Sequence, residues 1–398
     1  MKNYRKKITG FSLLQWFFWG SWATYGAYIV YYLSDMGYSN TEIGTIISIR
    51  TLLGLIGEPL LGYICDFYNT NKKVFIIGLL CIAVVILPFP YYNWWLILIA
   101  TGIIGFFWAP QQSILDSWIL KSSKKLSDNY GFMRAWGSVG FALTVIIFGK
   151  SVDTFGWKIL FITHFMFLVI ATVIAFFISD TPHISPEKNM KTDRENKDIS
   201  SDTNSKNPII LFKNIEYTVI VLSAIFIFIP NNIILIFLPQ FIKRVGGTPT
   251  ILGYVLFFNA ISEAPIFFLG KYMLRKFKPV SLLFIASCIY VLRVIIAFEA
   301  VSPGYFLIFG ALQSLSYGVL LITARFYINI IAPDSLRTSA QSILTMAAFG
   351  VGGIIASLTG GVIMDVYGMI VLYRSCLFLS LTGVLLMAGL LFYKRVLS

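Results

Sequence analysis

The stretch GSVGFALTVIIFGKSVDTFG at residues 137–156 returns in the second half of the chain as FGVGGIIASLTGGVIMDVYG at residues 349–368. The two stretches share the spacing of their glycines and an Asp-x-x-Gly ending. A second pair lies at almost the same offset, GEPLLGYICDFYNTNKK at 57–73 and SEAPIFFLGKYMLRKFK at 262–278. Glycine matches alone are also expected from close helix packing in membranes. Two matches at nearly the same offset indicate that the chain consists of two related halves.

The composition is that of a membrane protein. Of the 398 residues, 57% are hydrophobic and 12% are charged, whereas soluble domains carry roughly 25% charged residues. Apolar runs of about 20 residues recur along nearly the whole chain, and each is long enough to cross a bilayer as a helix. The sequence therefore predicts an all-α membrane protein embedded in the lipid bilayer, without a soluble domain of useful size.

Counting the apolar runs predicts twelve transmembrane helices in two groups of six. The expected spans are 10–33, 42–66, 73–91, 94–121, 132–153, 157–179, 214–240, 247–272, 279–300, 304–332, 338–365 and 369–393. We expect an N-terminal six-helix bundle over 1–180 and a C-terminal bundle over 209–398. The polar segment between them, 181–208, holds too few large apolar residues to fold and is expected to be a disordered cytoplasmic linker. Two related six-helix halves are the architecture of secondary transporters.

The basic residues mark the orientation of the chain. The net charge is +13, and Lys and Arg cluster at the N-terminus, at 72–73, 121–125 and 275–278, and near the C-terminus, while the alternate connections hold almost none. This alternation follows the positive-inside rule and predicts that both termini are cytoplasmic. The positive charge is thus explained by topology, and no nucleic-acid partner is expected.

Chemistry typical of an enzyme is not indicated. His164 and His183 are the only histidines, and no Ser/His/Asp, metal-ligand or phosphate-cradling arrangement is found. The cysteines lie scattered in or beside apolar runs with the spacing of neither a metal site nor a disulfide framework. We therefore expect no catalytic residues, no metal and no cofactor.

The segment GYICDFYNTNKK follows the second expected span. It resembles the signature loop of the major facilitator superfamily, in which a glycine, an aspartate and a basic pair occur in this order, although Phe67 stands where a basic residue is usual. The resemblance implies a twelve-helix 6+6 fold and a conformational gate formed by Gly62, Asp66, Lys72 and Lys73. Asp66 is expected to cap a helix and to pair with a basic residue.

Charged residues within the expected spans are costly and usually face a water-filled cavity or a partner. They are Arg50, Glu58, Asp116, Arg134, Glu263, Arg293 and Arg325. Asp116 and Arg134 each lie about five residues from the same short loop, so both should sit roughly 7 Å inside one membrane edge. Equal depth on neighbouring helices permits a carboxylate–guanidinium contact with donors left for a ligand. A structural salt bridge remains the alternative for each charge.

The segment YGFMRAWGSVGFA at 130–142 resembles the fifth helix of lactose-permease-type oligosaccharide:proton symporters. In that family an arginine at this place pairs with an acid of the fourth helix and binds sugar hydroxyls. The resemblance implies that Phe141 takes the place of the aromatic residue that stacks on the sugar. YVLRVIIAF at 290–298 resembles the ninth-helix arginine segment, which implies a role of Arg293 in proton coupling, together with Asp116.

A second resemblance covers more of the chain. Segments from LLQWFFWGSWATYGAY at 13–28 to TSAQSILTM at 338–346 are similar, in the same order, to those of bacterial nucleoside:proton symporters. This resemblance implies a small polar solute, best a nucleoside, imported across the bacterial cytoplasmic (inner) membrane. It implies substrate-binding roles for Arg134, Ser138, Phe141, Asn232, Glu263 and Tyr317. The chain departs from both families in the tenth helix, where Arg325 has no acidic neighbour and Gln313 and Ser316 replace coupling residues.

Glu263 is expected to carry the proton. It stands among apolar residues in AISEAPIFF, and an apolar setting favours the neutral form of a carboxyl group. Symport follows if solute and proton both favour one closed state of the transporter. Asp116 and Gln313 are further candidates for solute contact. Trp19, Trp22 or Tyr25 could stack on a nucleobase or sugar ring, although core packing explains each of these aromatic residues as well.

Several alternatives remain open. The solute could be a sugar or oligosaccharide, or an aromatic or sugar carboxylate held by intramembrane arginines such as Arg325 and Arg50. Export is less consistent with the sequence than import is, because the fifth helix lacks the Gly-Pro pair typical of proton-coupled antiporters. A sensor or lipid flippase is the alternative from another class, and a monomer is expected.

Overall fold

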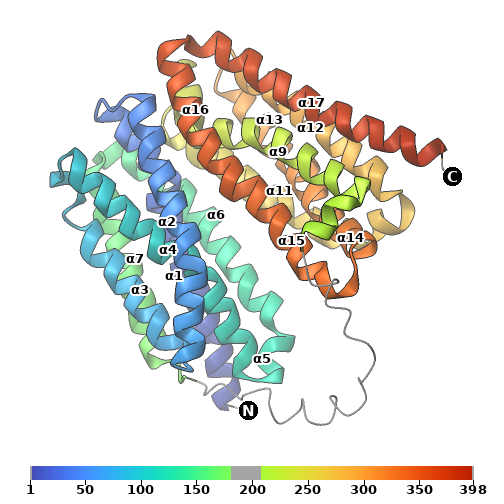
Figure 1. Cartoon of the computed structure of the whole chain (residues 1–398). Coiled ribbons are helices and arrows are strands. Elements are labelled where there is room, and N and C mark those ends of the chain that lie inside the picture. The colour runs from blue at the N-terminus through green and yellow to red at the C-terminus, as the bar shows by residue number, and fades with distance from the viewer. Residues whose placement is uncertain (1, 181–207, 397–398) are drawn as a thin grey trace, which may run out of the picture.

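The computed structural model describes residues 2–180 and 208–396, and every regular element in these two ranges is helical (Figure 1). The first range contains α1 (Lys2–Asp35), α2 (Asn40–Phe67), α3 (Asn71–Ile86), η1 (Phe89–Tyr91), α4 (Trp94–Ser122), α5 (Lys124–Asp128), α6 (Tyr130–Phe155) and α7 (Lys158–Phe177). The second contains η3 (Pro208–Lys213), α9 (Ile215–Ile236), α10 (Leu238–Arg244), α11 (Pro249–Lys276), α12 (Pro279–Glu299), α13 (Gly304–Ala311), η4 (Ser314–Gly318), α14 (Val319–Ile331), η5 (Asp334–Leu336), α15 (Arg337–Thr345), η6 (Met346–Val351), α16 (Gly352–Val366) and α17 (Gly368–Val396).

The predicted all-helical membrane fold is confirmed. Nine helical stretches of the described residues are long and apolar enough to cross a bilayer. The other three expected spans, 10–33, 73–91 and 247–272, coincide with α1, α3 and α11. The predicted linker lies outside the described residues, except for Pro208.

Three expected spans are interrupted rather than continuous. The span 214–240 divides at Phe237 into α9 and α10, because Pro239 at the start of α10 has no amide hydrogen to continue the helix. The spans 304–332 and 338–365 each pass through one turn of π-helix, η4 and η6. Such turns insert an extra residue into a helix and are frequent at functional sites.

Polar side chains fix where several helices begin. Ser39 precedes α2 and forms a capping box with Glu42, in which the Ser39 hydroxyl accepts from the Glu42 amide and the Glu42 carboxylate accepts from the Ser39 amide. Thr70 accepts from the Lys73 amide at the start of α3, and Asn93 caps α4. These caps satisfy backbone donors that the first turn of a helix leaves without partners.

The helices form two groups that meet along two crossings (Figure 1). Within the first range, α1 packs against α6 and α7, and α4 packs against α2 and α3. Within the second, α17 packs against α9 and α12. The two groups meet where α2 contacts α16 and where α6 contacts α11.

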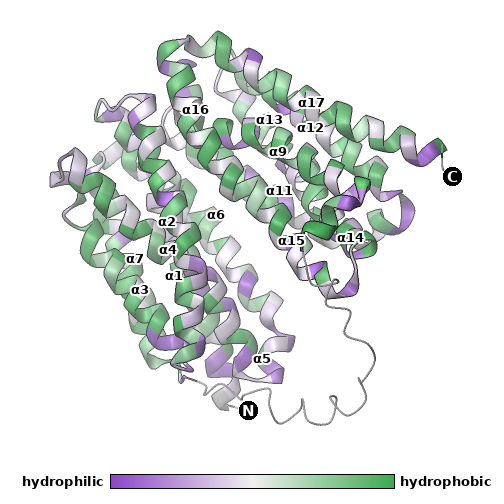
Figure 2. Ribbon diagram, in the orientation of Figure 1, coloured by the Kyte–Doolittle hydropathy of each residue, from purple (hydrophilic) through white to green (hydrophobic). Residues whose placement is uncertain are grey.

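The outer surface of the helices is apolar. Figure 2 shows hydrophobic residues along the lengths of the helices and hydrophilic residues gathered toward several helix ends. Large apolar side chains such as Val84, Phe177 and Leu385 are exposed. A surface of this kind is suited to lipid, where helices satisfy their backbone hydrogen bonds internally.

Candidate functional site

A cavity of about 640 Å³ lies between the two groups of helices. We call it the central cavity. Its lining combines aromatic rings with polar and charged groups, a mixture typical of sites for small molecules. The polar and aromatic lining residues are Trp19, Trp22, Arg50, Gln112, Arg134, Ser138, Phe141, Asn231, Asn232, Asn259, Glu263, Gln313, Tyr317 and Phe349.

Most of the solute contacts predicted from the sequence line this cavity. Four of them come from α1 and α6, and the others come from the second half of the chain. They are Trp19, Arg134, Ser138, Phe141, Asn232, Glu263, Gln313 and Tyr317. Residues from both halves therefore face one cavity. A solute bound there can contact both bundles at once.

Two predicted solute contacts lie outside the lining of the central cavity. Tyr25 is completely buried, and its ring packs against those of Phe89 and His164 within the first half. Asp116 accepts a hydrogen bond from Gln15 Nε2 at 3.4 Å behind the cavity wall. The structure thus places Tyr25 and Asp116 outside the lining of the central cavity, and direct solute contact by either residue stays a prediction.

The expected ion pair between Asp116 and Arg134 does not form. Among the ion pairs of the described residues, none within 4 Å joins these two side chains. The Arg134 guanidinium lies instead over the ring of Trp19, 4.5 Å from its centroid. Equal depth in the membrane is not enough for contact, because the two side chains must also point toward each other around their helix axes.

Arg293 lies one layer behind the central cavity. It is 1% exposed, its Nε donates to the Phe309 carbonyl at 3.2 Å, and its Nη1 donates to Asn231 Oδ1 at 3.3 Å and to Ser316 Oγ at 3.1 Å. Asn231 is itself a lining residue. Arg293 therefore reaches the site through Asn231 rather than by touching a solute.

The sequence did not single out four residues of the lining, which are Gln112, Asn231, Asn259 and Phe349, whereas the stacking candidate Trp22 does line the cavity. Asn231 and Asn259 carried a usable signal, since each is an amide within an apolar run. The π-helical turns have no such signal. They nevertheless place Tyr317 of η4 and Phe349 of η6 at the cavity, with the two rings 6.0 Å apart.

Several polar atoms near the cavity have no partner within the described residues. Asn231 Nδ2, Asn259 Oδ1 and Gln313 Oε1 are shielded from solvent and make no hydrogen bond. A buried polar group without a partner is costly, so such groups usually await a ligand or water. Donors and acceptors both remain available, which suits a solute with hydroxyl or amide groups.

A second cavity of about 1140 Å³ adjoins the first. Its lining includes Glu58 near the end of α2, Arg325 of α14 and Thr338 near the start of α15. It therefore lies toward the end of the bundle that holds both termini, which we call the termini end. Arg325 belongs to this second cavity and not to the central one, whereas Arg50 lines both.

The predicted gate loop makes its contacts within the first half of the chain. Asp66 Oδ1 lies 3.6 Å from Lys121 Nζ of α4, and Lys72 Nζ donates to the carbonyls of Phe176 and Ile178 at 2.7 Å. Thr70 rather than Asp66 caps α3, so that part of the prediction is wrong. Gly62 lies on α2, and Lys73 supplies only the capped amide among the contacts described for it.

The opposite end of the bundle, which we call the far end, is closed by the two Asp-x-x-Gly repeats. Asp365 of α16 accepts from Asn40 Nδ2 and from the Thr41 amide, both at 2.7 Å, at the first turn of α2. Asp153 of α6 accepts from Thr248 Oγ1 at 3.0 Å and from the Thr250 amide at 3.2 Å, at the first turn of α11. Each carboxylate thus caps a helix of the other half, where the helix dipole favours negative charge.

Glycines allow both crossings to close tightly. A Cβ on Gly44 of α2 would lie 2.1 Å from the Ser357 carbonyl oxygen of α16, and one on Gly253 of α11 would lie 2.7 Å from the Val145 carbonyl oxygen of α6. Both glycines stand four residues after the first residue of their helix. The two crossings are therefore built alike, as expected for a duplicated half.

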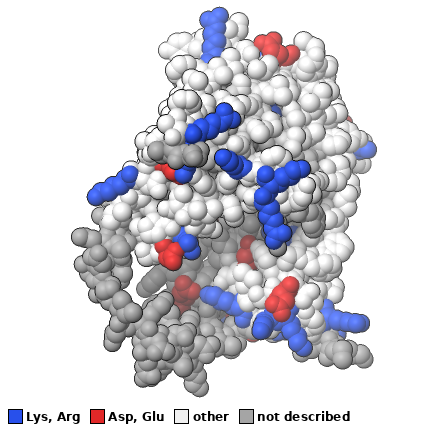
Figure 3. All heavy atoms as spheres, turned by 90° about the vertical axis from the view of Figure 1, so that its right-hand side faces the viewer, with Lys and Arg blue, Asp and Glu red and all other residues white. Residues whose placement is uncertain are grey.

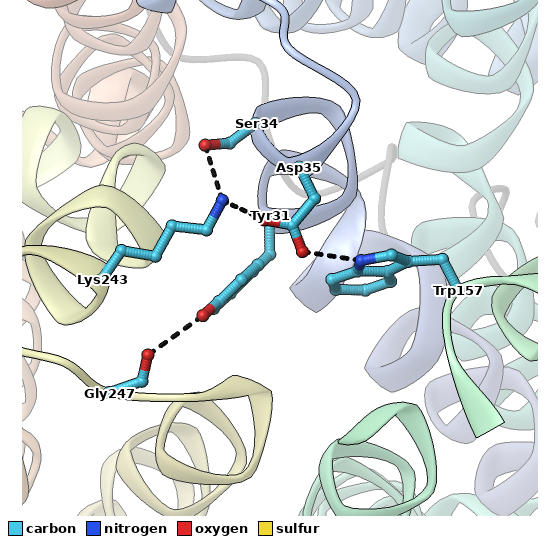
Figure 4. A network of polar contacts seen from close by, with 6 residues as sticks. All are labelled: Tyr31, Ser34, Asp35, Trp157, Lys243 and Gly247. Atoms are coloured by element: carbon cyan, nitrogen blue, oxygen red, sulfur yellow. Dashed lines mark hydrogen bonds and ion pairs between the residues drawn. The ribbon is translucent and has the colours of Figure 1, made fainter. Parts of the chain in front are cut away.

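An ion pair adds to the closure of the far end (Figure 4). Asp35 at the end of α1 pairs with Lys243 of α10 and accepts from Trp157 Nε1 at 2.7 Å. Lys243 also donates to Ser34 Oγ at 2.8 Å, and the Tyr31 hydroxyl donates to the Gly247 carbonyl at 3.1 Å. These contacts link the two halves on the side opposite the second cavity.

Replacement of Lys243 by methionine is expected to weaken this closure only modestly. Both side chains of the Asp35–Lys243 pair are about one-third exposed, and ion pairs of this kind contribute about 1 kcal/mol, or roughly fivefold in an equilibrium. The alkylation rate of a cysteine placed at Ser34 should rise by about that factor. The exchanged pair Asp35→Lys with Lys243→Asp serves as control and should restore the slower rate.

The comparisons agree with the observed fold. Residues 8–375 match the model of the MFS_1-like family. The chain is 25% identical to a maltose permease of Geobacillus stearothermophilus over 92% of this chain and 89% of the relative. It is 22% identical to YegT, a putative nucleoside transporter of Escherichia coli (strain K12), over 90% of this chain and 84% of that protein.

A solved structure shares the fold at low sequence identity. The nucleoside transporter NupG superposes with a TM-score of 0.77 at 16% identity, covering 96% of this chain and 97% of that structure. The match covers both halves of the chain. With the family model matching most of its length, the chain belongs to the MFS_1-like family of the major facilitator superfamily and is a multi-pass membrane transporter of small molecules rather than an enzyme.

Proposed function

We propose that the protein is a proton-coupled symporter that imports a small ring-containing polar solute by alternating access. A nucleoside is the first candidate. The observation that carries the proposal is the central cavity, where aromatic rings of Trp19, Phe141 and Tyr317 lie beside amides without partners. Flat rings bind the faces of a nucleobase or sugar, and amides bind its hydroxyl and carbonyl groups.

A sugar or oligosaccharide is the second candidate. The maltose permease relative supports it, since similarity extends over 92% of this chain. The cavity contains hydrogen-bonding groups on both sides, Arg134 and Ser138 from one half and Asn259 and Gln313 from the other. Such groups suit a solute with hydroxyls around its ring.

The termini end is proposed to face the cytoplasm, because the basic clusters of the sequence belong to that end. Lys and Arg side chains predominate over Asp and Glu on the face shown in Figure 3. With this orientation, the far end faces outside and is closed, and the second cavity connects the central cavity to the cytoplasmic side. We propose that 1–180 and 209–398 rock as two bundles, that the linker between them is cytoplasmic, and that one chain forms one working unit.

Glu263 is proposed as the proton carrier. It contributes a carboxylate to the central cavity, on α11, close to Gln313 and within electrostatic reach of Arg293. A carboxylate at a solute site can take up a proton on one side of the membrane and release it on the other. The proton is the proposed coupling ion, and no cofactor is proposed.

Transport by reconstituted protein tests the proposal. Proteoliposomes that contain a trapped pH indicator are supplied with uridine, adenosine, maltose or lactose under a proton gradient. We expect accumulation of one of these solutes together with acidification of the lumen, and collapse of both by an uncoupler. Accumulation without proton movement would contradict symport, and transport of none of them would contradict the proposed solute classes.

A further inference from the structure

Arg50 stands at the junction of the two cavities. It lies in the middle of α2 and contributes to the lining of both the central and the second cavity, as do Trp22, Gln112 and Phe349. Anything that moves from the central cavity toward the termini end passes this group of four residues. A positive charge at this place interacts electrostatically with any solute that passes.

No acidic side chain in the described part of the chain forms an ion pair with Arg50. None of the ion pairs there includes Arg50, and its Nη1 atom is shielded from solvent without a hydrogen-bond partner. The guanidinium lies 5.3 Å from the centroid of the Trp22 ring. An aromatic face attracts a cation but leaves its hydrogen-bond donors free.

The other arginines in or near the central cavity, Arg293 and Arg134, differ from Arg50 in this respect. Arg293 donates to Asn231, Ser316 and a backbone carbonyl, and it interacts with Glu263. Arg134 stacks on Trp19 and lies within electrostatic reach of Asp116. Glu58, the acid that shares α2 with Arg50, lies two helical turns away and lines only the second cavity.

We propose that Arg50 binds a carboxylate of the transported solute, so that the solute is a ring-containing organic acid such as a sugar acid or a nucleoside carboxylate. This inference rests on the proposed function, because it takes the central cavity to be the solute site. An unpaired buried cation is costly in a membrane. A singly charged carboxylate cancels that charge and matches the two-pronged geometry of a guanidinium.

The proposal also accounts for the aromatic group around Arg50. Trp22 and Phe349 line both cavities beside it, so a ring attached to the carboxylate can lie against them while its hydroxyls reach Asn231 and Gln313. A phosphate monoester is less suited to this site than a carboxylate, because a single guanidinium would leave its second negative charge without a counter-charge. The solute therefore combines a ring, hydroxyl groups and one carboxylate.

Binding to matched pairs of solutes tests this inference. Purified protein in nanodiscs is titrated with uridine and orotidine and with glucose and glucuronate, and binding is followed by fluorescence of the cavity tryptophans and by thermal shift. In at least one pair we expect the acid to bind about tenfold or more tightly than its neutral partner, as for a hydrogen-bonded charge pair. Arg50→Gln should remove this preference, so that the acid and its neutral partner bind with similar affinity.

Control variants distinguish a specific effect of Arg50 from a general effect of positive charge on the protein. Lys158→Gln removes one positive charge at an exposed position outside both cavities and should keep the preference for the acid. Equal binding of acid and neutral solutes, or a preference that survives Arg50→Gln, would overturn the inference. Loss of the preference in Arg325→Gln but not in Arg50→Gln would also overturn it, as would tighter binding of glucose 6-phosphate than of glucuronate.

These outcomes are distinct from failure of the proposed function. If the neutral solutes bind and are transported but the acids have no advantage, the inference fails and the proposed function stands. If neither member of any pair binds or is transported, the proposed function itself fails.

Discussion

Glu263→Gln is expected to reduce proton-driven accumulation of solute by at least about 100-fold, because the substitution keeps the shape of the side chain but removes its exchangeable proton. Binding of the solute and its exchange across the membrane should persist. The Glu263 side chain faces the central cavity and makes no ion pair within 4 Å among the described residues. A glutamine of the same size therefore breaks no salt bridge there.

Two transport assays in one proteoliposome preparation check this prediction. Uphill uptake under a proton gradient reports coupling, and counterflow of labelled against unlabelled solute reports exchange. Glu58→Gln is the matched control, since Glu58 lines the second cavity but not the central one, and it should retain accumulation. Uphill uptake by Glu263→Gln at the wild-type level would show that another group carries the proton.

The double variant Asp153→Ala, Asp365→Ala is expected to open the far end about 100-fold more often than the wild type does. Each carboxylate accepts hydrogen bonds from the first turn of a helix in the opposite half. Hydrogen bonds to charged groups contribute about 1.5–3 kcal/mol each, so loss of both clusters costs at least about 3 kcal/mol of closure. This effect exceeds that expected for the Asp35–Lys243 pair, because Asp153 and Asp365 each accept several hydrogen bonds across the interface.

Alkylation of a buried reporter cysteine measures the opening. Ser48 of α2 is 6% exposed and hydrogen-bonds to Ser357 of α16 at 2.6 Å across the crossing. In a background without the four native cysteines, Ser48→Cys should react slowly, and the double alanine variant should react about 100-fold faster. The matched variant Asp153→Asn, Asp365→Asn keeps oxygen acceptors without the charge and should react at an intermediate rate. An unchanged alanine variant would mean that the capping contacts do not hold the far end closed.

The fold was predictable because its main signals are local. Runs of about 20 apolar residues give the spans, and the repeated Asp-x-x-Gly endings give the two halves. The break at Pro239 and the π-helical turns η4 and η6 were not expected. A proline within an apolar run does not reveal from sequence alone whether the helix continues through it or a new helix begins there. A π-helical turn depends on packing between helices rather than on a residue type.

The candidate site was predictable in part, because charged residues in apolar spans rarely face lipid. Arg134 and Glu263 do line the central cavity. Asp116 lies outside this lining and makes no ion pair with Arg134, since depth along a helix says nothing about the direction of a side chain around the helix axis. Asn231 and Asn259 were missed because uncharged amides give a weaker signal in an apolar run.

The closed far end presents a surface that exists in only one state of the transporter. Tyr38 lies two residues before Asn40 and Tyr367 two residues after Asp365, so each tyrosine adjoins one partner of the hydrogen bonds between Asn40 and Asp365. Tyr367 is exposed, and Tyr38 is partly exposed. An antibody fragment whose epitope includes both tyrosines would recognise the closed far end, arrest the transport cycle and add rigid mass for electron cryomicroscopy.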